Sequence, residues 1–239
     1  MILGETRRYL ERPEILVFDV NETLIDIESL QPLFERVFGD RERLREWFGQ
    51  VVTYSMALTL SEQYVDFFTL GRSTFTMIAA VHNVELASTD LDDIESGMRS
   101  MPAHEDVEPA LRRLSNAGYR LATLTNSPSV AEGLSPLERA GIAGLFERRL
   151  SVHSFRAFKP ASRIYRDTAV ELGVPASSCL MIAAHMWDTM GAQSAGFGGG
   201  LITRRGNAPL HLPGVPTPDF VASDLHDLAD QVLGRWDAE

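Results

Sequence analysis

The chain has 239 residues, of which 44% are hydrophobic, enough to fill a sizeable core and too many for an intrinsically disordered protein. Its 33 acidic residues outnumber 22 Lys and Arg, and the net charge of -11 makes nucleic acid and anionic membrane surfaces unfavourable partners. The single cysteine, Cys179, excludes a disulfide framework and a zinc site built from several thiolates, and it favours a reducing cytoplasm.

The first 14 residues lack the apolar stretch of a secretory signal, and no later apolar run approaches the roughly 20 residues that cross a bilayer. A buried parallel strand is expected over residues 14–19, and strands then alternate with helices beyond residue 103. This alternation predicts an α/β fold with helices on both faces of a mostly parallel sheet. The later strands are expected at 120–125, 147–152, 179–184, 199–203 and 219–222, and the helices at 107–117, 136–140, 161–172, 187–195 and 224–236.

Residues 27–102 interrupt the alternation, because they show helical periodicity and no convincing strand. Pro102 bars the continuation of a helix and marks the return to the sheet. We therefore expect a Rossmann-like core made of residues 14–26 and 103–239, with a helical cap domain, residues 27–102, inserted after the first strand. Ligands bind at the carboxyl edge of open parallel sheets, so the cap is expected to cover that edge.

Polar side chains gather at the expected carboxyl ends of the strands. Asp19 ends the first strand, where a carboxylate can act as a nucleophile or merely cap a turn. Thr125 and Asn126 offer hydrogen bonds to an anionic group at the end of the next strand, while Lys159 and Asp188 follow two later strands. Parallel strands bring these four turns to one edge, so the set predicts a single site.

Four motifs, in this order, resemble those of the haloacid dehalogenase superfamily, and within it the type II 2-haloacid dehalogenases. They are FDVNETLID at 18–26, TLTNSP at 123–128, FKPASRIY at 158–165 and AAHMWDTMGA at 183–192. The family patterns read roughly FDAYGTLFD, LSNG, YKPDxxVY and SSNAWDATGA. The resemblance implies a hydrolase that displaces halide from short 2-haloalkanoic acids through an aspartyl ester, gives 2-hydroxy acids and needs no cofactor.

The resemblance also implies a role for each matching residue. Asp19 is the nucleophile that attacks the carbon bearing the halogen, and Thr23 orients it. Lys159 compensates the charge of Asp19, and Asp188 positions the hydrolytic water. A lysine beside two carboxylates is expected to keep both of them ionised. The residues expected to contact the substrate are Asn21, Phe48, Thr125, Asn126, Tyr165 and His185.

The sequence departs from the family pattern at positions that face the substrate. Phe48 stands where the pattern has a cap arginine that faces the leaving halide, so we expect a site short of positive charge and slow dehalogenation. His185 replaces the asparagine of SSNAWD and is expected to contact the substrate or the water, or else to bond to backbone at the strand end. Asn21 and Glu22 replace the aromatic residue and the glycine of FDAYG.

Two other functions remain open on the sequence. A magnesium-dependent phosphohydrolase of the same superfamily needs an acid two residues after the nucleophile and another shortly before the last aspartate, where this chain has Asn21, Ala183 and Ala184. We therefore expect no metal. A weakly active or non-catalytic relative is the third possibility. The partners expected are a small haloacid and, through the cap, a second copy of the chain, with no nucleic acid and no membrane.

Overall fold

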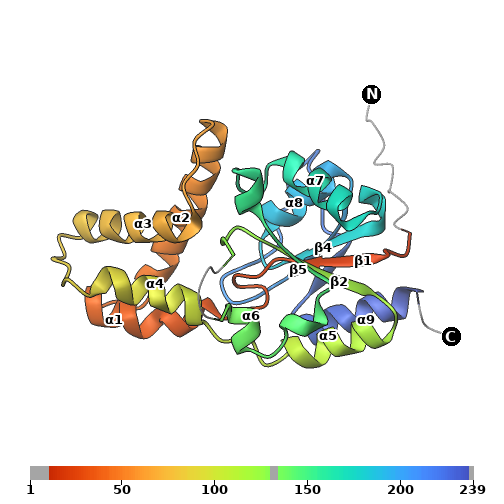
Figure 1. Ribbon diagram of the computed structural model, residues 1–239, viewed down its shortest axis with the longest axis horizontal. Coiled ribbons are helices and arrows are strands. Elements are labelled where there is room, and N and C mark those ends of the chain that lie inside the picture. The colour runs from red at the N-terminus through yellow and green to blue at the C-terminus, as the bar shows by residue number, and fades with distance from the viewer. Residues whose placement is uncertain (1–10, 130–133, 237–239) are drawn as a thin grey trace.

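A parallel sheet of six strands, in the order β3-β2-β1-β4-β5-β6, organises the fold (Figure 1). The computed structural model describes residues 11–129 and 134–236. The expectation of a parallel α/β sheet is confirmed, and the expected strands are found with shifts of about one residue at their ends. The strands are β1 (Ile15–Phe18), β2 (Arg120–Thr125), β3 (Arg148–Ser151), β4 (Cys179–Ala183), β5 (Gly198–Ile202) and β6 (Phe220–Ala222).

Helices cover both faces of this sheet, with α7 and α8 on one face and α5 and α9 on the other (Figure 1). β1 lies between β2 and β4 and all four of its residues are buried, which explains its unbroken apolar run. The helices are α5 (Val107–Asn116), α6 (Pro136–Arg139), α7 (Ser162–Leu172), α8 (Met186–Ala195) and α9 (Leu225–Trp236). Short 3-10 helices are Ile27–Leu30, Ala143–Leu145, Val152–Phe155 and Ala176–Ser178.

Between β1 and α5 the chain forms a group of helices beside the sheet, here called the helical segment, residues 27–101 (Figure 1). This segment, described throughout, contains no strand. Its own core includes Phe34, whose ring centroid lies 5.4 Å from those of Trp47 and Phe75. The helices are α1 (Gln31–Phe38), α2 (Arg43–Leu60), α3 (Phe67–Val81) and α4 (Asp90–Ser100).

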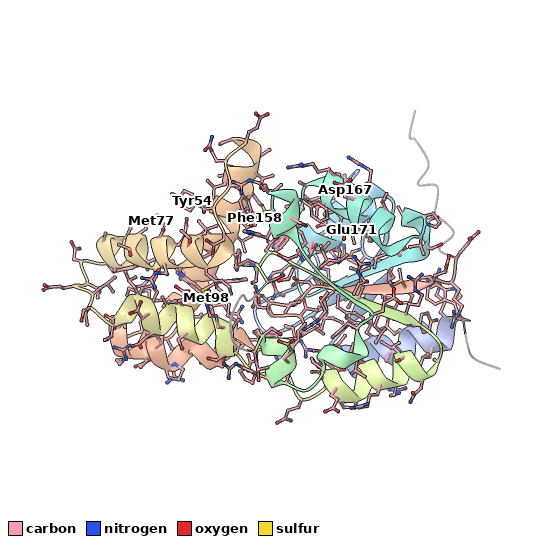
Figure 2. The ribbon with its side chains drawn as sticks, in the orientation of Figure 1. Tyr54, Met77, Met98, Phe158, Asp167 and Glu171 are labelled. Carbon is pink, nitrogen blue, oxygen red and sulfur yellow. The ribbon has the colours of Figure 1, made fainter. Side chains whose placement is uncertain are left out.

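Phe158 connects the helical segment to the sheet, where α2 approaches it (Figure 2). The Phe158 ring stacks on Tyr64 with centroids 5.1 Å apart, and its backbone N–H donates to Thr59 Oγ1 over 2.9 Å. The residue that follows Phe158 is Lys159, so these contacts also fix the segment that carries the lysine.

None of the helices in the described ranges is long and apolar enough to cross a bilayer. The expectation that the chain starts without a secretory signal falls largely on residues 1–10, which lie outside the described residues.

Gly191 lies at a close approach of α8 to the segment that carries Lys159. A Cβ at Gly191 would lie 2.5 Å from Pro160 Cβ and 2.9 Å from the Pro160 carbonyl oxygen. We expect Gly191→Ala to lower the free energy of unfolding by about 1–3 kcal/mol through overpacking. Gly49→Ala in α2 is the matched control, since its Cβ would meet nothing within 4 Å, and it is expected to raise stability by up to about 1 kcal/mol. Urea denaturation measures both, and equal effects would contradict the packing argument.

Candidate active site

The carboxyl edge of the sheet brings the four expected catalytic residues together. Asp19 directly follows β1, and its N–H donates to the Ile182 carbonyl of β4 over 2.9 Å. Asp188 lies in the first turn of α8, just after β4, and Lys159 precedes α7. Thr23 donates its hydroxyl proton to Asp19 Oδ2 over 2.8 Å and accepts the Ala184 N–H over 2.8 Å, which fixes the orientation of the Asp19 carboxylate.

Lys159 lies between the two aspartates and is fully buried. Its Nζ is 2.8 Å from Asp19 Oδ1 and 2.6 Å from Asp188 Oδ2, and it donates to the Leu124 carbonyl over 2.9 Å. These three acceptors match the three N–H donors of an ammonium group, so the buried charge is completely hydrogen-bonded. Burial alone would lower the pKa of Lys159, but the charges of Asp188 and Asp19 outweigh it and raise the pKa.

The two aspartates have pKa values shifted in opposite directions. Burial raises the pKa of Asp19, but Lys159 and His185 outweigh it and hold that pKa far below its ordinary value. Burial also raises the pKa of Asp188, the negative charge of Asp19 adds to this effect, and Lys159 opposes it without cancelling it. The sequence-based expectation is that Lys159 keeps both aspartates ionised. The structure adds a difference between them, because Asp188 is the more basic of the two, as a nucleophile and a water-activating base require.

Tyr165 differs from the sequence-based expectation of a substrate contact. Its side chain is fully buried, and its hydroxyl donates to Asp188 Oδ1 over 2.6 Å. On its other side the ring packs edge-on against Phe197, with centroids 6.0 Å apart. Tyr165 therefore supports Asp188 from behind, and it does not line the cavity described next.

A cavity of about 210 Å³ opens between the carboxyl edge of the sheet, α6 and the helical segment, and neither Asp19 nor Lys159, Asp188 or His185 lines it. From the sheet side it is lined by Asn21, Thr125 and Ser127, and from the helices by Phe68 and Met98. Thr125 Oγ1 accepts the Ser127 N–H, and Asn21 Nδ2 donates to Ser127 Oγ, each over 3.1 Å. Expected substrate contacts Asn21 and Thr125 thus share one wall, in a space sized for a small molecule.

Asn126 has a different environment from its neighbour Thr125. It is buried, and its Oδ1 accepts the Lys159 N–H over 3.1 Å. Its side-chain oxygen therefore holds the segment that carries the lysine. Of the two residues expected to bind an anionic group, Thr125 faces the cavity described above and Asn126 positions Lys159.

His185 is fixed beside the nucleophile by residues from three parts of the chain. Its Nε2 donates to Glu22 Oε2 over 2.6 Å, and its Nδ1 lies 3.8 Å from Asp19 Oδ2. One face of the ring stacks on Trp187 with centroids 5.0 Å apart, and Phe48 of α2 lies 5.8 Å away. Burial would lower the pKa of His185, but the Asp19 and Glu22 carboxylates outweigh it and raise the pKa to about 9.

The expectation of a site without a cation near Phe48 is therefore corrected. At neutral pH the imidazole ring that lies against Phe48 is protonated, because its pKa of about 9 exceeds the pH. In the family pattern an arginine on a cap helix supplies the cation. In this chain His185, which lies just after β4, supplies it. The alternative for His185, a bond to backbone at the strand end, is not what the structure has, since its partner is the Glu22 carboxylate.

Glu22 and Arg45 are site residues that the sequence reasoning missed. Glu22 is buried, and besides His185 it pairs with Arg45 of α2, which also pairs with Glu28. The φ of Glu22 is 64°, a left-handed conformation that favours the glycine of the family pattern. The signal was present in the sequence, because an acid at the glycine position and a histidine at the asparagine position are complementary changes.

The donors at this edge do not fit a divalent cation. The Lys159 ammonium already lies within 2.8 Å of both carboxylates that such an ion would need, and the remaining positions are Asn21, Ala183 and Ala184. In the part of the chain that the structure describes, no group of three or more His, Cys, Asp or Glu side chains is placed to hold a metal.

Comparisons with known proteins place the chain in a family. The sequence model of the haloacid dehalogenase-like hydrolases matches residues 13–196. The chain belongs to this family. Among similar hydrolases, (S)-2-haloacid dehalogenase 4A of Burkholderia cepacia is 30% identical over 196 residues, which cover 81% of this chain and 84% of the relative.

Two further proteins extend this similarity. Haloacetate dehalogenase H-2 of a Moraxella species is 29% identical, over 88% of this chain and 94% of that protein. A solved structure of an L-2-haloacid dehalogenase superposes with a TM-score of 0.85 at 27% identity, over 93% of this chain and 99% of that one. The similarity therefore spans both the sheet and the helical segment.

Proposed function

We propose that this protein is a hydrolase that cleaves the carbon–halogen bond of short 2-haloalkanoic acids. Asp19 attacks the carbon that carries the halogen, the halide leaves with the bonding electron pair, and an ester forms on the Asp19 side chain. Water then attacks the carbonyl carbon of that ester, which releases a 2-hydroxy acid and regenerates the Asp19 carboxylate. The similarity to haloacid dehalogenases supports this substrate class.

The observation that carries the proposal is the position of Lys159 between Asp19 and Asp188. The ammonium holds Asp19 ionised without a metal ion, and its hydrogen bonds fix Oδ1 of the nucleophile. Asp188 is the group that takes a proton from water in the second step, since its raised pKa makes it the stronger base of the two. Tyr165 and Lys159 each bond one oxygen of Asp188 and so hold it in place.

Within this proposal, residues 27–102 act as a cap domain on a core made of residues 14–26 and 103–239. The contribution of Phe68 and Met98 to the cavity supports such a role, because substrate must fit between the helices and the sheet edge. Thr125 and Asn21 bind the substrate carboxylate from the opposite wall. We further propose a homodimer formed through the cap and a cytoplasmic location, and light scattering of the purified protein tests the dimer.

Mass spectrometry of a single turnover in heavy-oxygen water tests the covalent step. With enzyme in excess over 2-bromopropionate, one heavy oxygen is expected in the peptide that contains Asp19, because water attacks the aspartyl carbonyl carbon. Lactate is then expected to carry only the light oxygen that came from Asp19. Label in lactate with none in the Asp19 peptide would mean direct attack of water on the substrate, and would refute the aspartyl ester.

Halide release is expected to survive exhaustive treatment with a chelator, with less than about twofold change in rate. The reason is that Lys159 takes the place between Asp19 and Asp188 at which a divalent ion would bind. Ion chromatography of released chloride measures the rate. Loss of activity in chelator that added magnesium restores would contradict the role of Lys159 and favour a phosphohydrolase, which assays with phosphate monoesters would then reveal.

A further inference from the structure

Three positions at which this chain departs from the family pattern form one contact group in the structure. Glu22 stands at the glycine position, His185 at the asparagine position and Phe48 at the cap arginine position. Glu22 bonds the His185 ring at Nε2, and the Phe48 ring lies against it with centroids 5.8 Å apart. Glu22, Phe48 and His185 therefore form one surface beside Asp19, here called the altered wall, and His185 lies at its centre.

One polar atom of this wall has no partner. His185 is 7% exposed, and its Nδ1 is buried without a hydrogen-bond partner among the described residues. The closest acceptor, Asp19 Oδ2, is 3.8 Å away, which is too far for a hydrogen bond. A buried donor without an acceptor costs free energy comparable to a lost hydrogen bond. An atom of a bound ligand, placed beside the nucleophile, would satisfy it.

We propose that His185 is a catalytic residue of the halide-displacing step, in which the Nδ1–H of its protonated ring, held in place by Glu22, hydrogen-bonds the departing halide. This inference rests on the proposed function and adds the group that receives the leaving anion. As the new bond forms between Asp19 and carbon, the halide takes the electron pair of the carbon–halogen bond, and the proton stays on His185. Glu22 is a positioning residue, since it contacts the ring and not the substrate.

The charged groups packed around His185 together favour its protonated form. The Asp19 and Glu22 carboxylates face its two nitrogens. Arg45 of α2 pairs with Glu22, and Lys159 pairs with Asp19, so each cation acts through an intervening carboxylate. The remaining acid nearby is Asp188, on the helix that begins after His185, and it is bonded to Lys159 and Tyr165. Trp187 and Phe48 pack against the ring of His185, and the residue is 7% exposed.

A halide suits this position better than other parts of the substrate. In an in-line displacement the attacking oxygen lies roughly 3–3.5 Å from the carbon, and the halide leaves on the far side. Phe48 occupies the place from which the pattern directs an arginine at that halide, and the His185 ring contacts Phe48. A hydrogen bond from a charged donor is about twice as strong as a neutral one, and it strengthens as negative charge builds up on the halogen.

Single-turnover kinetics with His185→Asn test the proposal. Ester formation on Asp19 is followed by rapid quench and mass spectrometry with 2-bromo- and 2-chloropropionate. We expect ester formation from the chloro acid to fall about a hundredfold, and that from the bromo acid to fall less, since chloride is the poorer leaving group. The wild-type rate is also expected to fall as the pH rises through about 9, where the His185 ring loses its proton, and the variant should lack this fall.

His82→Asn is the matched control, because His82 also bonds a glutamate, Glu46, through Nε2 over 2.9 Å, but lies in the helical segment away from Asp19. It is expected to change neither the rates nor their pH dependence. Equal slowing of both acids by His185→Asn, or normal ester formation followed by slow hydrolysis, would overturn the inference and leave the proposed function standing. A wild-type protein that forms no Asp19 ester with either acid would overturn both.

NMR of the wild-type protein provides a test that does not depend on the folding of His185→Asn. The ring protons of His185 followed by NMR are expected to titrate near pH 9, and to shift when bromide is added below that pH. In Glu22→Gln the same titration is expected at lower pH, because one of the two carboxylates that raise the pKa is gone. A His185 signal that does not respond to bromide, or a titration that Glu22→Gln leaves unchanged, would contradict the proposal.

Discussion

Replacing Asp19 by Asn is expected to abolish halide release, a loss of roughly 10⁴-fold or more, because the side chain then has no anionic oxygen to attack carbon. The amide keeps the size of the carboxylate, but its single oxygen can accept from only one of Thr23 and Lys159, which both donate to Asp19 in the wild-type protein. Thermal unfolding of the variant shows whether the fold is retained, so that loss of activity can be assigned to chemistry. Chloride release under steady-state conditions, together with the intact mass of the variant, measures the effect and detects any deamidation back to Asp.

Asp66→Asn provides the control for this change. Asp66 caps α3 by accepting from the Phe68 and Thr69 N–H groups, a role that Asn fills equally well. Its activity and melting temperature are expected to match those of the wild-type protein. Residual halide release above about 1% in an Asp19→Asn preparation free of deamidated protein would show that another group, or water itself, attacks the substrate.

Lys159→Met is expected to slow ester formation at neutral pH by about a hundredfold or more. Methionine fills much of the same space, but Asp19 and Asp188 then share a buried site without the cation that lies between them. Burial and mutual repulsion would raise the pKa of Asp19, which Lys159 holds down in the wild-type protein. The variant should therefore recover part of its rate as the pH increases, in a range where the wild-type rate does not rise.

Rapid-quench measurement of ester formation between pH 5 and 8 gives the profile for both proteins. A Lys159→Met variant that is slow by the same factor at every pH would show that the lysine acts on the bound substrate and not on the ionisation of Asp19. Thermal unfolding of the same samples separates this effect from a loss of structure, since removal of one member of a buried ionic group commonly costs about 3–5 kcal/mol.

The sequence predicted the core of this site because parallel sheets place distant residues by a simple rule. Asp19 and Lys159 are separated by 140 positions in the chain, yet both follow strands whose carboxyl ends share an edge. The alternation of strand and helix patterns along the chain fixed the bounds of the strands to about one residue. The fully buried Tyr165 shows the limit of this reasoning, because a motif match gives a residue's place in the chain and not the direction of its side chain.

Contacts across the boundary between helices and sheet could not be predicted in the same way. Arg45 lies on α2, in a region whose helical periodicity predicts which face is buried but not which core residue a given side chain meets. Its pairing with Glu22 depends on how the helical segment sits on the sheet edge. The pKa of His185 depends in turn on that arrangement, so the charge state of the altered wall followed only from the structure.

The left-handed backbone of Glu22 has a consequence for the history of this sequence. A non-glycine residue at φ 64° costs about 1–2 kcal/mol, and a buried carboxylate costs more unless cations accompany it. A glycine-to-glutamate change is thus tolerable only where His185 and Arg45 are already present, whereas the reverse change would leave the buried His185 and the partly exposed Arg45 without their shared acid. Related chains are therefore expected to divide into two groups. In one, glutamate occurs with both of these partners, and in the other, glycine occurs with neither, with few intermediates between them.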